Sequence, residues 1–365
     1  MMWFHFKVSN LPLEPLDVVI ENAGECSYVE GWANYRAVYS TDRLNWERLG
    51  ATSYDEASGE LRMTIDRNND LAGASFVWLA YFAPYSYEDY MTFVGACAQS
   101  DRCSVETIGA TLDGADMEVL TVRAAGSDAS EDASKRSIWL IARQHPGESQ
   151  ASWWMEGCLA RLLDEADPLS AKLLEGATFR VVANMNPDGS RRGHLRTNAA
   201  GANLNREWAK PSEVYSPEVF HVLREMQQSG LDFCLDVHGD EALPYNFIAG
   251  AEGIPSWTTR LASLQKEFCI AYERANPDFQ LVEGYDVDAP GEANMLVCSN
   301  ALTERFDAPA LTLEMPFKVG HNTQKTYQRV GVYKYLCADG RAHPSRITPT
   351  RRTRRSVGRP TAAGG

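Results

Sequence analysis

From residue 85 onward, strand-like and helix-like segments alternate along the chain, and this alternation limits the folds that the sequence can adopt. The strand-like runs are short and apolar, and they cover residues 117–124, 137–143, 178–184, 231–238 and 310–316. Helical patterns accompany them at residues 87–99, 151–166, 216–230, 257–275 and 325–337. Such alternation predicts an α/β domain in which helices flank a mixed, largely parallel sheet.

The first 84 residues contain strand-like runs only. These runs are separated by clusters of Asn, Gly, Asp and Ser, and they cover residues 3–9, 16–21, 34–40, 60–66 and 75–83. Short strands at this spacing, without a helical period, predict an antiparallel β-sandwich. The pattern changes at Ser86, which can cap a helix that has acidic residues in its first turn. We therefore expect a β-sandwich domain at 1–84 and an α/β domain at 85–340.

The charge of the chain is unevenly distributed. The 365 residues carry a formal net charge of -14 at pH 7, which argues against general nucleic-acid binding. Residues 341–365 contain seven Arg and no acidic residue, so they contribute +7 and residues 1–340 carry -21. This basic tail has no apolar periodicity and is predicted to be disordered.

The sequence gives no indication of a targeting or membrane segment. The first 15 residues lack the basic and apolar regions of a signal peptide, and no apolar run reaches about 18 residues. The eight cysteines form no Cys-x-x-Cys pair, and they lie at positions 26, 97, 103, 158, 234, 269, 298 and 337. We expect reduced, mostly buried thiols in a cytoplasmic protein that binds neither membranes nor nucleic acid.

The strand-like run that starts at Ser137 stops at a histidine and a glutamate three residues apart. Pro146 and Gly147 prevent a direct continuation into a helix, so His145 and Glu148 are predicted to lie on the turn at the carboxyl end of the strand. Open α/β sheets bind their ligands at this edge. An imidazole and a carboxylate on one tight turn can bind the same cation, and these ligand types suit zinc.

Two other strand-like runs end in residues that could join this site. One is followed by His238 and another ends at Glu314. Because βαβ connections bring the carboxyl ends of strands to one edge, both can reach His145 and Glu148. Three protein ligands that leave a fourth position for water are typical of a catalytic zinc site. Glu314, alone in an apolar strand, is suited to be the general base, and the alternative is a structural pair with an arginine.

Residues 184–208 are rich in Gly, Asn and Arg and show no amphipathic period, so we expect a loop. Guanidinium groups can bind a carboxylate through two hydrogen bonds and can stabilise a developing oxyanion. Arg196 and Arg206 are the candidates for these roles. We interpret Arg191 and Arg192 as solvated loop charges.

The order of these elements resembles that of the zinc metallocarboxypeptidases. The matching elements are His-Pro-Gly-Glu at 145–148, Asn-Pro-Asp-Gly at 186–189, Arg196, Asn-Arg at 205–206, His238, and Leu-Thr-Leu-Glu-Met-Pro-Phe at 311–317. The chain looks most like the cytosolic carboxypeptidase branch, in which a small β-sandwich precedes the catalytic α/β domain. The resemblance covers residues 1 to about 340, and it is specific because six separated elements keep their order.

The resemblance implies a metal centre and a reaction. One zinc ion would be bound by His145, Glu148 and His238. Glu314 would act as the general base and then as the proton shuttle. The substrate would be the C-terminus of a peptide or protein, from which the enzyme hydrolyses the last residue.

The resemblance also implies roles on the substrate side. Arg196 would polarise the scissile carbonyl, and Asn205 with Arg206 would bind the C-terminal carboxylate. Tyr285, in a Gly-rich loop, is the candidate for the mobile substrate-binding tyrosine of the family, and an ordinary loop tyrosine is the alternative. The cytosolic branch prefers acidic C-terminal residues, and Arg305 is our hypothesis for the basic group that would bind them. The alternative for Arg305 is an ion pair with a neighbouring acidic residue.

One position departs from the family pattern. The family usually has an Asp two residues before the Asn-Arg pair, and this Asp accepts a hydrogen bond from the first zinc histidine. The present chain has Asn203 at that position. An amide oxygen can still orient His145 but adds no negative charge behind it, so we expect a less basic ligand and reduced activity.

Two other functions are compatible with the same scaffold. A zinc deacylase of N-acyl amino acids would share the His-x-x-Glu motif and the distant histidine, but the separate Asn-Pro-Asp-Gly and Asn-Arg elements favour a peptidase. A non-catalytic module that binds zinc or peptides is the third interpretation. The glutamate at position 314 argues against it, because a binding module needs no general base.

Overall fold

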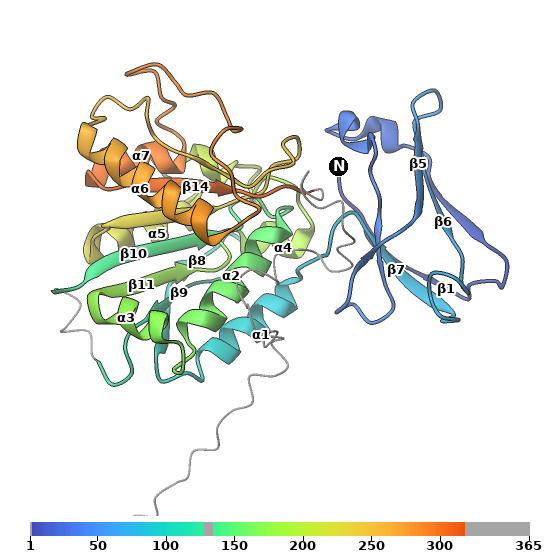
Figure 1. Ribbon diagram of the computed structural model, residues 1–365, viewed down its shortest axis with the longest axis horizontal. Coiled ribbons are helices and arrows are strands. Elements are labelled where there is room, and N and C mark those ends of the chain that lie inside the picture. The colour runs from blue at the N-terminus through green and yellow to red at the C-terminus, as the bar shows by residue number, and fades with distance from the viewer. Residues whose placement is uncertain (1, 128–133, 318–365) are drawn as a thin grey trace, which may run out of the picture.

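The computed structural model describes residues 2–127 and 134–317, which form two domains side by side (Figure 1). The N-terminal domain, drawn in blue, lies beside a larger α/β domain. The predicted helix at 325–337, the basic tail at 341–365 and the predicted domain limit at 340 lie outside the described residues. Among the described residues, no helix combines the length and the apolar character needed to cross a bilayer.

The N-terminal domain contains two antiparallel sheets. One sheet has the strand order β1 (His5–Ser9), β7 (Phe76–Ala80), β3 (Val38–Ser40) and β4 (Glu47–Arg48). The other has the order β2 (Leu16–Ile20), β6 (Glu60–Ile65) and β5 (Ala51–Asp55). Two short 3-10 helices, η1 (Ala23–Glu25) and η2 (Val29–Trp32), follow β2.

Alternate side chains of the two sheets meet in a common apolar core. In β6, Leu61, Met63 and Ile65 are buried, and Val77 and Leu79 of β7 belong to the same core. One face of each strand is therefore buried, which is the cause of the period of two in the sequence. The predicted β-sandwich is confirmed.

The second domain is built on a seven-stranded sheet with the order β13-β14-β12-β10-β11-β9-β8. The four central strands are parallel: β14 (Ala310–Glu314), β12 (Phe233–Val237), β10 (Arg136–Ala142) and β11 (Ala177–Val182). The three outer strands are antiparallel to their neighbours: β13 (Phe247–Ala249), β9 (Asp116–Val122) and β8 (Cys103–Ala110). The predicted mixed, largely parallel sheet is confirmed.

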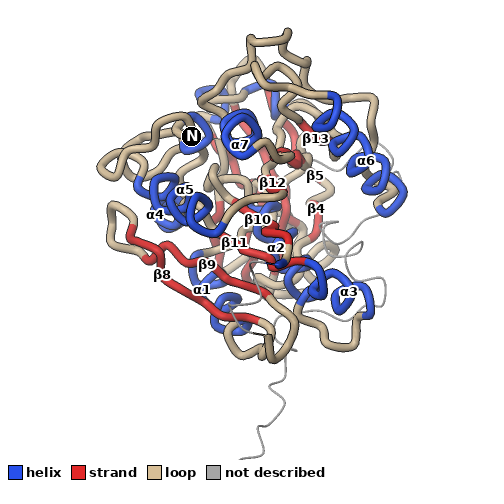
Figure 2. The backbone as a smooth tube through the Cα atoms, turned by 90° about the vertical axis from the view of Figure 1, so that its left-hand side faces the viewer, coloured by secondary structure: helices blue, strands red, loops and turns tan. Residues whose placement is uncertain are grey.

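Helices cover both faces of this sheet, as Figures 1 and 2 show. One face packs against α1 (Tyr87–Cys97), α2 (Ser149–Leu162), α3 (Pro168–Gly176) and α6 (Thr259–Ala275). The other packs against α5 (Pro217–Ser229) and α7 (Cys298–Phe306). In β10, Leu140 enters the first core, whereas Trp139 and Ile141 enter the second. Burial on both faces explains why β10 is a continuous apolar run in the sequence.

Part of the predicted loop at 184–208 is helical instead. The helix α4 (Pro187–Arg192) begins after Asn186, whose side chain accepts a hydrogen bond from the N–H of Gly189 (3.0 Å). It ends at Gly193, which has a left-handed φ of 72°. A helix of six residues is too short to show an amphipathic period. The structure also contains β8 and α7, for which the sequence pattern was too weak to predict an element.

Aromatic stacking joins the two domains close to the end of β14. The ring of Phe82, just after β7, stacks on that of Phe317 with 5.5 Å between centroids and 14° between planes. Leu195 of the second domain packs against the core of the N-terminal domain. Both contacts lie near the segments that carry the predicted site residues, so the N-terminal domain supports that edge of the sheet.

Candidate metal centre and substrate site

Three neighbouring parallel strands end at the same edge of the sheet, and each contributes a predicted site residue. His145 and Glu148 follow β10, His238 follows β12, and Glu314 is the last residue of β14. The N–H of His238 donates to the carbonyl oxygen of Leu313 (2.8 Å), so His238 and Glu314 occupy adjacent positions on neighbouring strands. The strand order alone therefore brings the four residues together.

The turn that carries His145 begins with a strained residue. Arg143 has a φ of 63°, in the left-handed region that residues other than glycine rarely adopt. Its buried guanidinium donates to the carbonyl oxygen of Pro146 (2.6 Å), to Ser152 Oγ (2.9 Å) and to the carbonyl oxygen of Tyr85 (3.5 Å). Burial lowers the pKa of Arg143 to about 10. These bonds fix the turn against α2 and against the segment that links the domains.

Gly147 allows a second loop to approach this turn. Its N–H donates to the carbonyl oxygen of Leu195 (2.8 Å), and a Cβ atom at this position would lie 2.9 Å from the same oxygen. A side chain at position 147 would therefore displace Leu195 and with it the adjacent Arg196. The motif therefore requires a glycine at position 147, because a larger residue would collide with Leu195.

The side chains of His145, Glu148 and His238 converge in a buried cluster. The distance is 2.7 Å from His145 Nδ1 to Glu148 Oε1 and 2.8 Å from His238 Nδ1 to Glu148 Oε2. The two Nδ1 atoms lie 3.2 Å apart. Ligand atoms around a tetrahedral zinc, with metal–ligand bonds of about 2.0–2.2 Å, lie about 3.3–3.6 Å from one another, which is a few tenths of an ångström more than the separations found here. The cluster therefore has the donor types that a zinc ion requires and nearly the size.

The outer nitrogen of each histidine is held by a hydrogen-bond acceptor. His145 Nε2 lies 2.9 Å from Asn203 Oδ1, and His238 Nε2 lies 3.0 Å from Asp236 Oδ2. Asn203 Oδ1 also accepts from the N–H of Asn205 (3.1 Å), which identifies this atom as the oxygen. Both histidines are thus oriented with Nε2 facing an acceptor, and Nδ1 of each faces the cluster. Nδ1 is therefore the nitrogen that can bind a metal once it carries no proton.

A buried polar chain behind His238 was not found from the sequence. The indole N–H of Trp208 donates to Gln144 Oε1 (2.8 Å), and the amide of Gln144 donates to Asp236 Oδ2 (2.5 Å), the oxygen that also contacts His238. A usable signal was present, because Asp236 precedes His238 by two residues and side chains two apart lie on the same face of a strand. The roles of Gln144 and Trp208 depend on tertiary contacts alone.

The charges of the cluster favour an ionised Glu148. Burial alone would raise its pKa, but His145 and His238 outweigh this effect and hold the pKa of Glu148 well below its ordinary value. Burial also lowers the pKa of His145 despite the neighbouring carboxylate. At His238, the carboxylates of Asp236 and Glu148 overcome the effect of burial and raise the pKa. The cluster presents a carboxylate and a neutral His145 to a cation.

Glu314 lies beside this cluster and has a free oxygen. Its side chain is buried, and its Oε2 has no hydrogen-bond partner among the described residues. Burial, together with Glu148, Asp240 and Asp236, raises the pKa of Glu314 well above its ordinary value. A buried carboxylate with a high proton affinity and an unpaired oxygen can accept a proton from a small molecule at the site.

Arg196 and Arg206 form no ion pair with a carboxylate within residues 2–127 and 134–317, although the charge of Arg196 also acts on Glu241. Arg196 is exposed and makes no hydrogen bond to the described residues, but its charge acts on both His145 and Arg206. Arg206 is half-buried and donates to the carbonyl oxygen of Asn205 (2.7 Å). Asn205 Oδ1 accepts from the N–H of Cys298 (2.8 Å), which leaves its amide nitrogen as a donor for a ligand. The three side chains can together bind an anion.

The structure separates Arg191 and Arg192 from this group. Arg192 forms an ion pair with Asp113 (2.6 Å), and Arg191 lies over the ring of Tyr87 at 5.4 Å from its centroid. Both residues belong to α4 and have local partners. Neither is brought to the cluster.

Tyr285 lies on the rim of the site. Its hydroxyl donates to Asp240 Oδ2 (2.7 Å), and its ring packs edge-on against Phe247 of β13 with 5.0 Å between centroids. Burial, Glu314 and Asp240 all raise the pKa of Tyr285 above its ordinary value, so the hydroxyl keeps its proton. The half-exposed ring therefore has its polar end directed toward the catalytic edge. No pattern in the sequence indicated the role of Asp240.

Arg305 is not brought to the site, and its predicted role in the pocket needs correction. It lies in the last turn of α7, is exposed, and donates to the carbonyl oxygen of Ala209 (3.3 Å). Because α7 precedes the parallel strand β14, it runs antiparallel to that strand. Its last turn therefore lies at the opposite end of the sheet from Glu314. The predicted alternative, an ion pair with Glu304 or Asp307, is not formed within the described residues either, since Asp307 pairs with Arg260.

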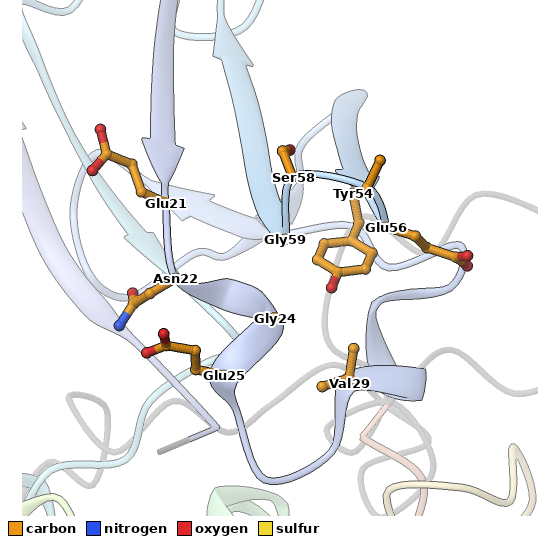
Figure 3. A pocket seen from close by; sticks show the side chains of 10 residues that line it. Glu21, Asn22, Gly24, Glu25, Val29, Tyr54, Glu56, Ser58 and Gly59 are labelled. Carbon is orange, nitrogen blue, oxygen red and sulfur yellow. The ribbon is translucent and has the colours of Figure 1, made fainter.

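A hollow on the N-terminal domain contains none of the predicted site residues. Figure 3 shows that it lies beside η1 and is lined by Glu21, Glu25 and Glu56 and by the ring of Tyr54.

The described cysteines at 26, 97, 103, 158, 234, 269 and 298 are all free thiols. Within the described residues, the donor set at the edge of the large sheet is the group suited to a metal.

This α/β/α fold, with a buried His-Glu-His set at the carboxyl edge of its sheet, defines a zinc-dependent hydrolase. Residues 1–82 match the family model of the cytosolic carboxypeptidase N-terminal domain, and residues 90–276 match that of zinc carboxypeptidase. The chain belongs to the zinc carboxypeptidase family, in its cytosolic carboxypeptidase-like branch, and it is a metallocarboxypeptidase.

Solved structures and curated relatives agree with this membership. A metallo-carboxypeptidase from Burkholderia cenocepacia is 40% identical, with a TM-score of 0.82 over 92% of this chain and 88% of that chain. A metallo-carboxypeptidase from Pseudomonas aeruginosa, solved with (2-guanidinoethylmercapto)succinic acid, is 40% identical, with a TM-score of 0.79 over 87% of this chain and 81% of that one. An uncharacterized protein of Zymomonas mobilis is 44% identical over 87% of this chain and 79% of its own length.

Similarity to the animal cytosolic carboxypeptidases covers only part of those proteins. Human cytosolic carboxypeptidase 4 is 32% identical over 47% of this chain, which is 17% of its own length. Mouse cytosolic carboxypeptidase 6 is 26% identical over 68% of this chain and 48% of its own length. The chain thus spans half or less of the length of these two relatives.

Proposed function

We propose that this enzyme hydrolyses the last residue from the C-terminus of peptides or proteins. The observation that carries this proposal is the free Oε2 of Glu314, placed beside the His145, Glu148 and His238 donor set. A proton acceptor next to a metal site is needed for hydrolysis and has no use in a binding module. The unpaired guanidinium groups of Arg196 and Arg206 add a place for the terminal carboxylate.

His145, Glu148 and His238 would hold one zinc ion. When bound, zinc lowers the pKa of a coordinated water to about 7 and polarises a carbonyl. The chain prepares the site for the ion through Asn203 and Asp236, which hold the outer nitrogens of the two histidines.

Glu314 takes the proton of the attacking water and later delivers it to the amine of the leaving residue. Its raised pKa suits both steps, because a group must hold the proton between them.

Arg196 and the Asn205–Arg206 pair act on two different parts of the substrate. The terminal carboxylate is bound by the fork of Arg206 and the amide nitrogen of Asn205, which have no other anionic partner among the described residues. Arg196 contacts the oxygen of the scissile carbonyl, where negative charge develops during attack. An N-acyl amino acid could bind to the same three side chains. Activity on longer peptides is therefore needed to distinguish a peptidase from a deacylase.

The preference for an acidic C-terminal residue rests on the family resemblance alone. Arg305 cannot supply the basic group, because it lies at the opposite end of the sheet. The compound in the complex of the Pseudomonas aeruginosa relative combines a succinic acid with a guanidinium group, so a preference for basic C-terminal residues is worth testing as well. Rates on matched peptides ending in Glu, Phe and Lys would establish the preference of this chain.

We also propose that the enzyme acts in the cytoplasm on peptide or protein substrates. This proposal is supported by the cytosolic carboxypeptidases among its relatives and by the free thiols of the described cysteines. Fractionation of cells that express the full chain would test it.

The test of the reaction is a peptide ladder read by mass spectrometry. The zinc-loaded enzyme is expected to shorten a peptide from its C-terminus by single residues and to leave the same peptide with a C-terminal amide intact. Removal of zinc with a chelator should stop the reaction, and zinc should restore it. Cleavage of N-acyl amino acids without any cleavage of peptides would instead support the deacylase, and no cleavage of either would contradict the proposal.

A further inference from the structure

Asn198 is a fully buried amide inside the loop that carries the candidate substrate-binding groups. It lies two residues after Arg196 and five before Asn203, and its side chain is 0% exposed. Neither the metal centre nor the proposed reaction uses it. A buried amide in a polar loop requires several partners, because an unpaired one destabilises the fold.

The oxygen and the backbone of Asn198 close the loop on itself. Its Oδ1 accepts from the N–H of Ala200 (3.0 Å) and of Ala202 (2.9 Å). Its own N–H donates to the carbonyl oxygen of Ala202 (2.9 Å), and its carbonyl oxygen accepts from Gly201 (3.1 Å). Gly201 has a φ of 82°, so the turn depends on a glycine at that position. The closed turn sets how far Arg196 lies from the segment that begins at Asn203.

The amide nitrogen of Asn198 ties this turn to α5. It donates to the carbonyl oxygen of Tyr215 (2.9 Å) and to Glu218 Oε2 (3.1 Å), with Glu218 Oε1 at 3.4 Å. Glu218 is also 0% exposed and lies in the first turn of α5, where the helix dipole favours a carboxylate. Val219, Val222, Leu223 and Met226 of α5 pack into the core of the α/β domain. The loop is thereby attached to a rigid element.

We propose that Asn198 and Glu218 are positioning residues that hold Arg196 on one side, and Asn205 with Arg206 on the other, at the spacing that a substrate's terminal residue requires. This inference rests on the proposed function. The pair touches neither substrate nor metal, and it acts through the closed turn between the two binding groups. A misplacement of about 1 Å in such groups can cost about a hundredfold in rate.

The experiment compares Asn198→Ala and Asn198→Asp with the wild type on one peptide substrate. We expect kcat/KM to fall about 10–100-fold in both variants, with most of the loss in KM. Zinc affinity of the apoprotein, measured by chelator competition, should stay within about twofold, because the turn at 145–148 has its own supports. If Asn198 only stabilised the fold, its replacement would weaken zinc binding as well as raise KM.

A double variant keeps the inference testable if single variants are unstable. Asn198→Asp places a carboxylate against Glu218, and adding Glu218→Gln removes one of the two facing charges. We expect the double variant to recover a large part of kcat/KM compared with Asn198→Asp alone. No recovery, or an unchanged KM in Asn198→Ala, would overturn the inference.

Two controls separate this inference from the proposed function. Arg206→Ala should raise KM directly, so an effect of Arg206→Ala without any effect of the Asn198 variants would reject the positioning role alone. An inactive wild type would reject the proposed function itself. Asn276→Ala is the matched control, because the Asn276 side chain accepts from the N–H of Asp278 (2.9 Å) in a turn outside this loop, and it should leave KM unchanged.

Discussion

The Nε2 atom of His145 lies 2.9 Å from the amide oxygen of Asn203, whereas the equivalent atom of His238 lies 3.0 Å from the carboxylate of Asp236. The two metal-ligand histidines are therefore supported unequally, one by a neutral group and one by an anion. A carboxylate behind a histidine makes its other nitrogen more basic. His238 is the stronger of the two nitrogen ligands, and His145 is the ligand that a substitution can improve.

Asn203→Asp is expected to tighten zinc binding by about tenfold or more, since changes behind a metal ligand commonly alter affinity by about 10–100-fold. Either residue can accept from the N–H of Asn205, so the local turn should persist. Chelator competition on the apoprotein measures the effect. Asp236→Asn is the opposite change and should weaken binding. Equal affinities in all three proteins would show that the charge behind the histidines is unimportant.

Glu314→Gln is expected to lower kcat by about 10²–10⁴-fold, because general acid–base catalysis contributes that much. Zinc binding should be retained, since Glu314 is not a member of the donor set. Glu304→Gln is a suitable control, because Glu304 accepts from Ser256 at an exposed site and should keep normal kcat. Near-normal turnover in Glu314→Gln would mean that another group takes the proton.

The residues at the strand ends could be predicted because each interrupts an apolar run. His145, Glu148, His238 and Glu314 are polar at places where buried strands stop, and a parallel sheet brings such places to one edge. The contact between Asn203 and His145 was expected from the family resemblance, and the structure contains it. The prediction of these residues required strand order but no side-chain detail.

The residues that were missed depend on contacts between distant segments. Gln144 directly precedes the predicted motif, but its role is to join Asp236 to Trp208, which is 64 residues away in the sequence. The position of Arg305 was predicted wrongly because α7 was not predicted. Arg305 shortly precedes β14 in the sequence and so lies near the start of this strand, whereas the prediction placed it near Glu314 at the end of the strand. The role of Asn198 could not be recognised in the sequence, because its side chain contacts backbone atoms and one buried carboxylate.

Arg305→Ala is expected to leave the C-terminal preference unchanged. Its guanidinium contacts only the carbonyl oxygen of Ala209 within the described residues, at the end of the sheet opposite to Glu314. The ratio of kcat/KM for peptides ending in Glu and Phe measures the preference, and this ratio should match that of the wild type. Arg206→Ala, in contrast, should raise KM for both peptides, because every C-terminus carries a carboxylate. A change of the ratio in Arg305→Ala would restore its predicted role in the pocket.

Glu218 gives the fold a pH dependence that can be measured apart from catalysis. Burial raises its pKa from 4.5 to about 7, with a smaller contribution from Asp188, although Asn198 donates to it. The folded protein therefore binds this proton more tightly than the unfolded chain does. The cost to stability begins above about pH 4.5, grows until about pH 7, and stays constant at higher pH.

Glu218→Gln should remove this cost, because glutamine has the same shape and no charge to bury. One unit of pKa shift corresponds to about 1.4 kcal/mol. The free energy of unfolding of the variant minus that of the wild type should therefore increase by about 3 kcal/mol from pH 4.5 to pH 8. Urea unfolding of both metal-free proteins at these two pH values measures the difference. Asp167→Asn is the comparison variant, because Asp167 has a pKa lowered by Arg161 and by its capping bonds. A lowered pKa acts below the ordinary value of 3.8, so the stability of this variant relative to the wild type should stay nearly constant between pH 4.5 and pH 8. A pH-independent difference for Glu218→Gln as well would show that Glu218 is ionised at little cost.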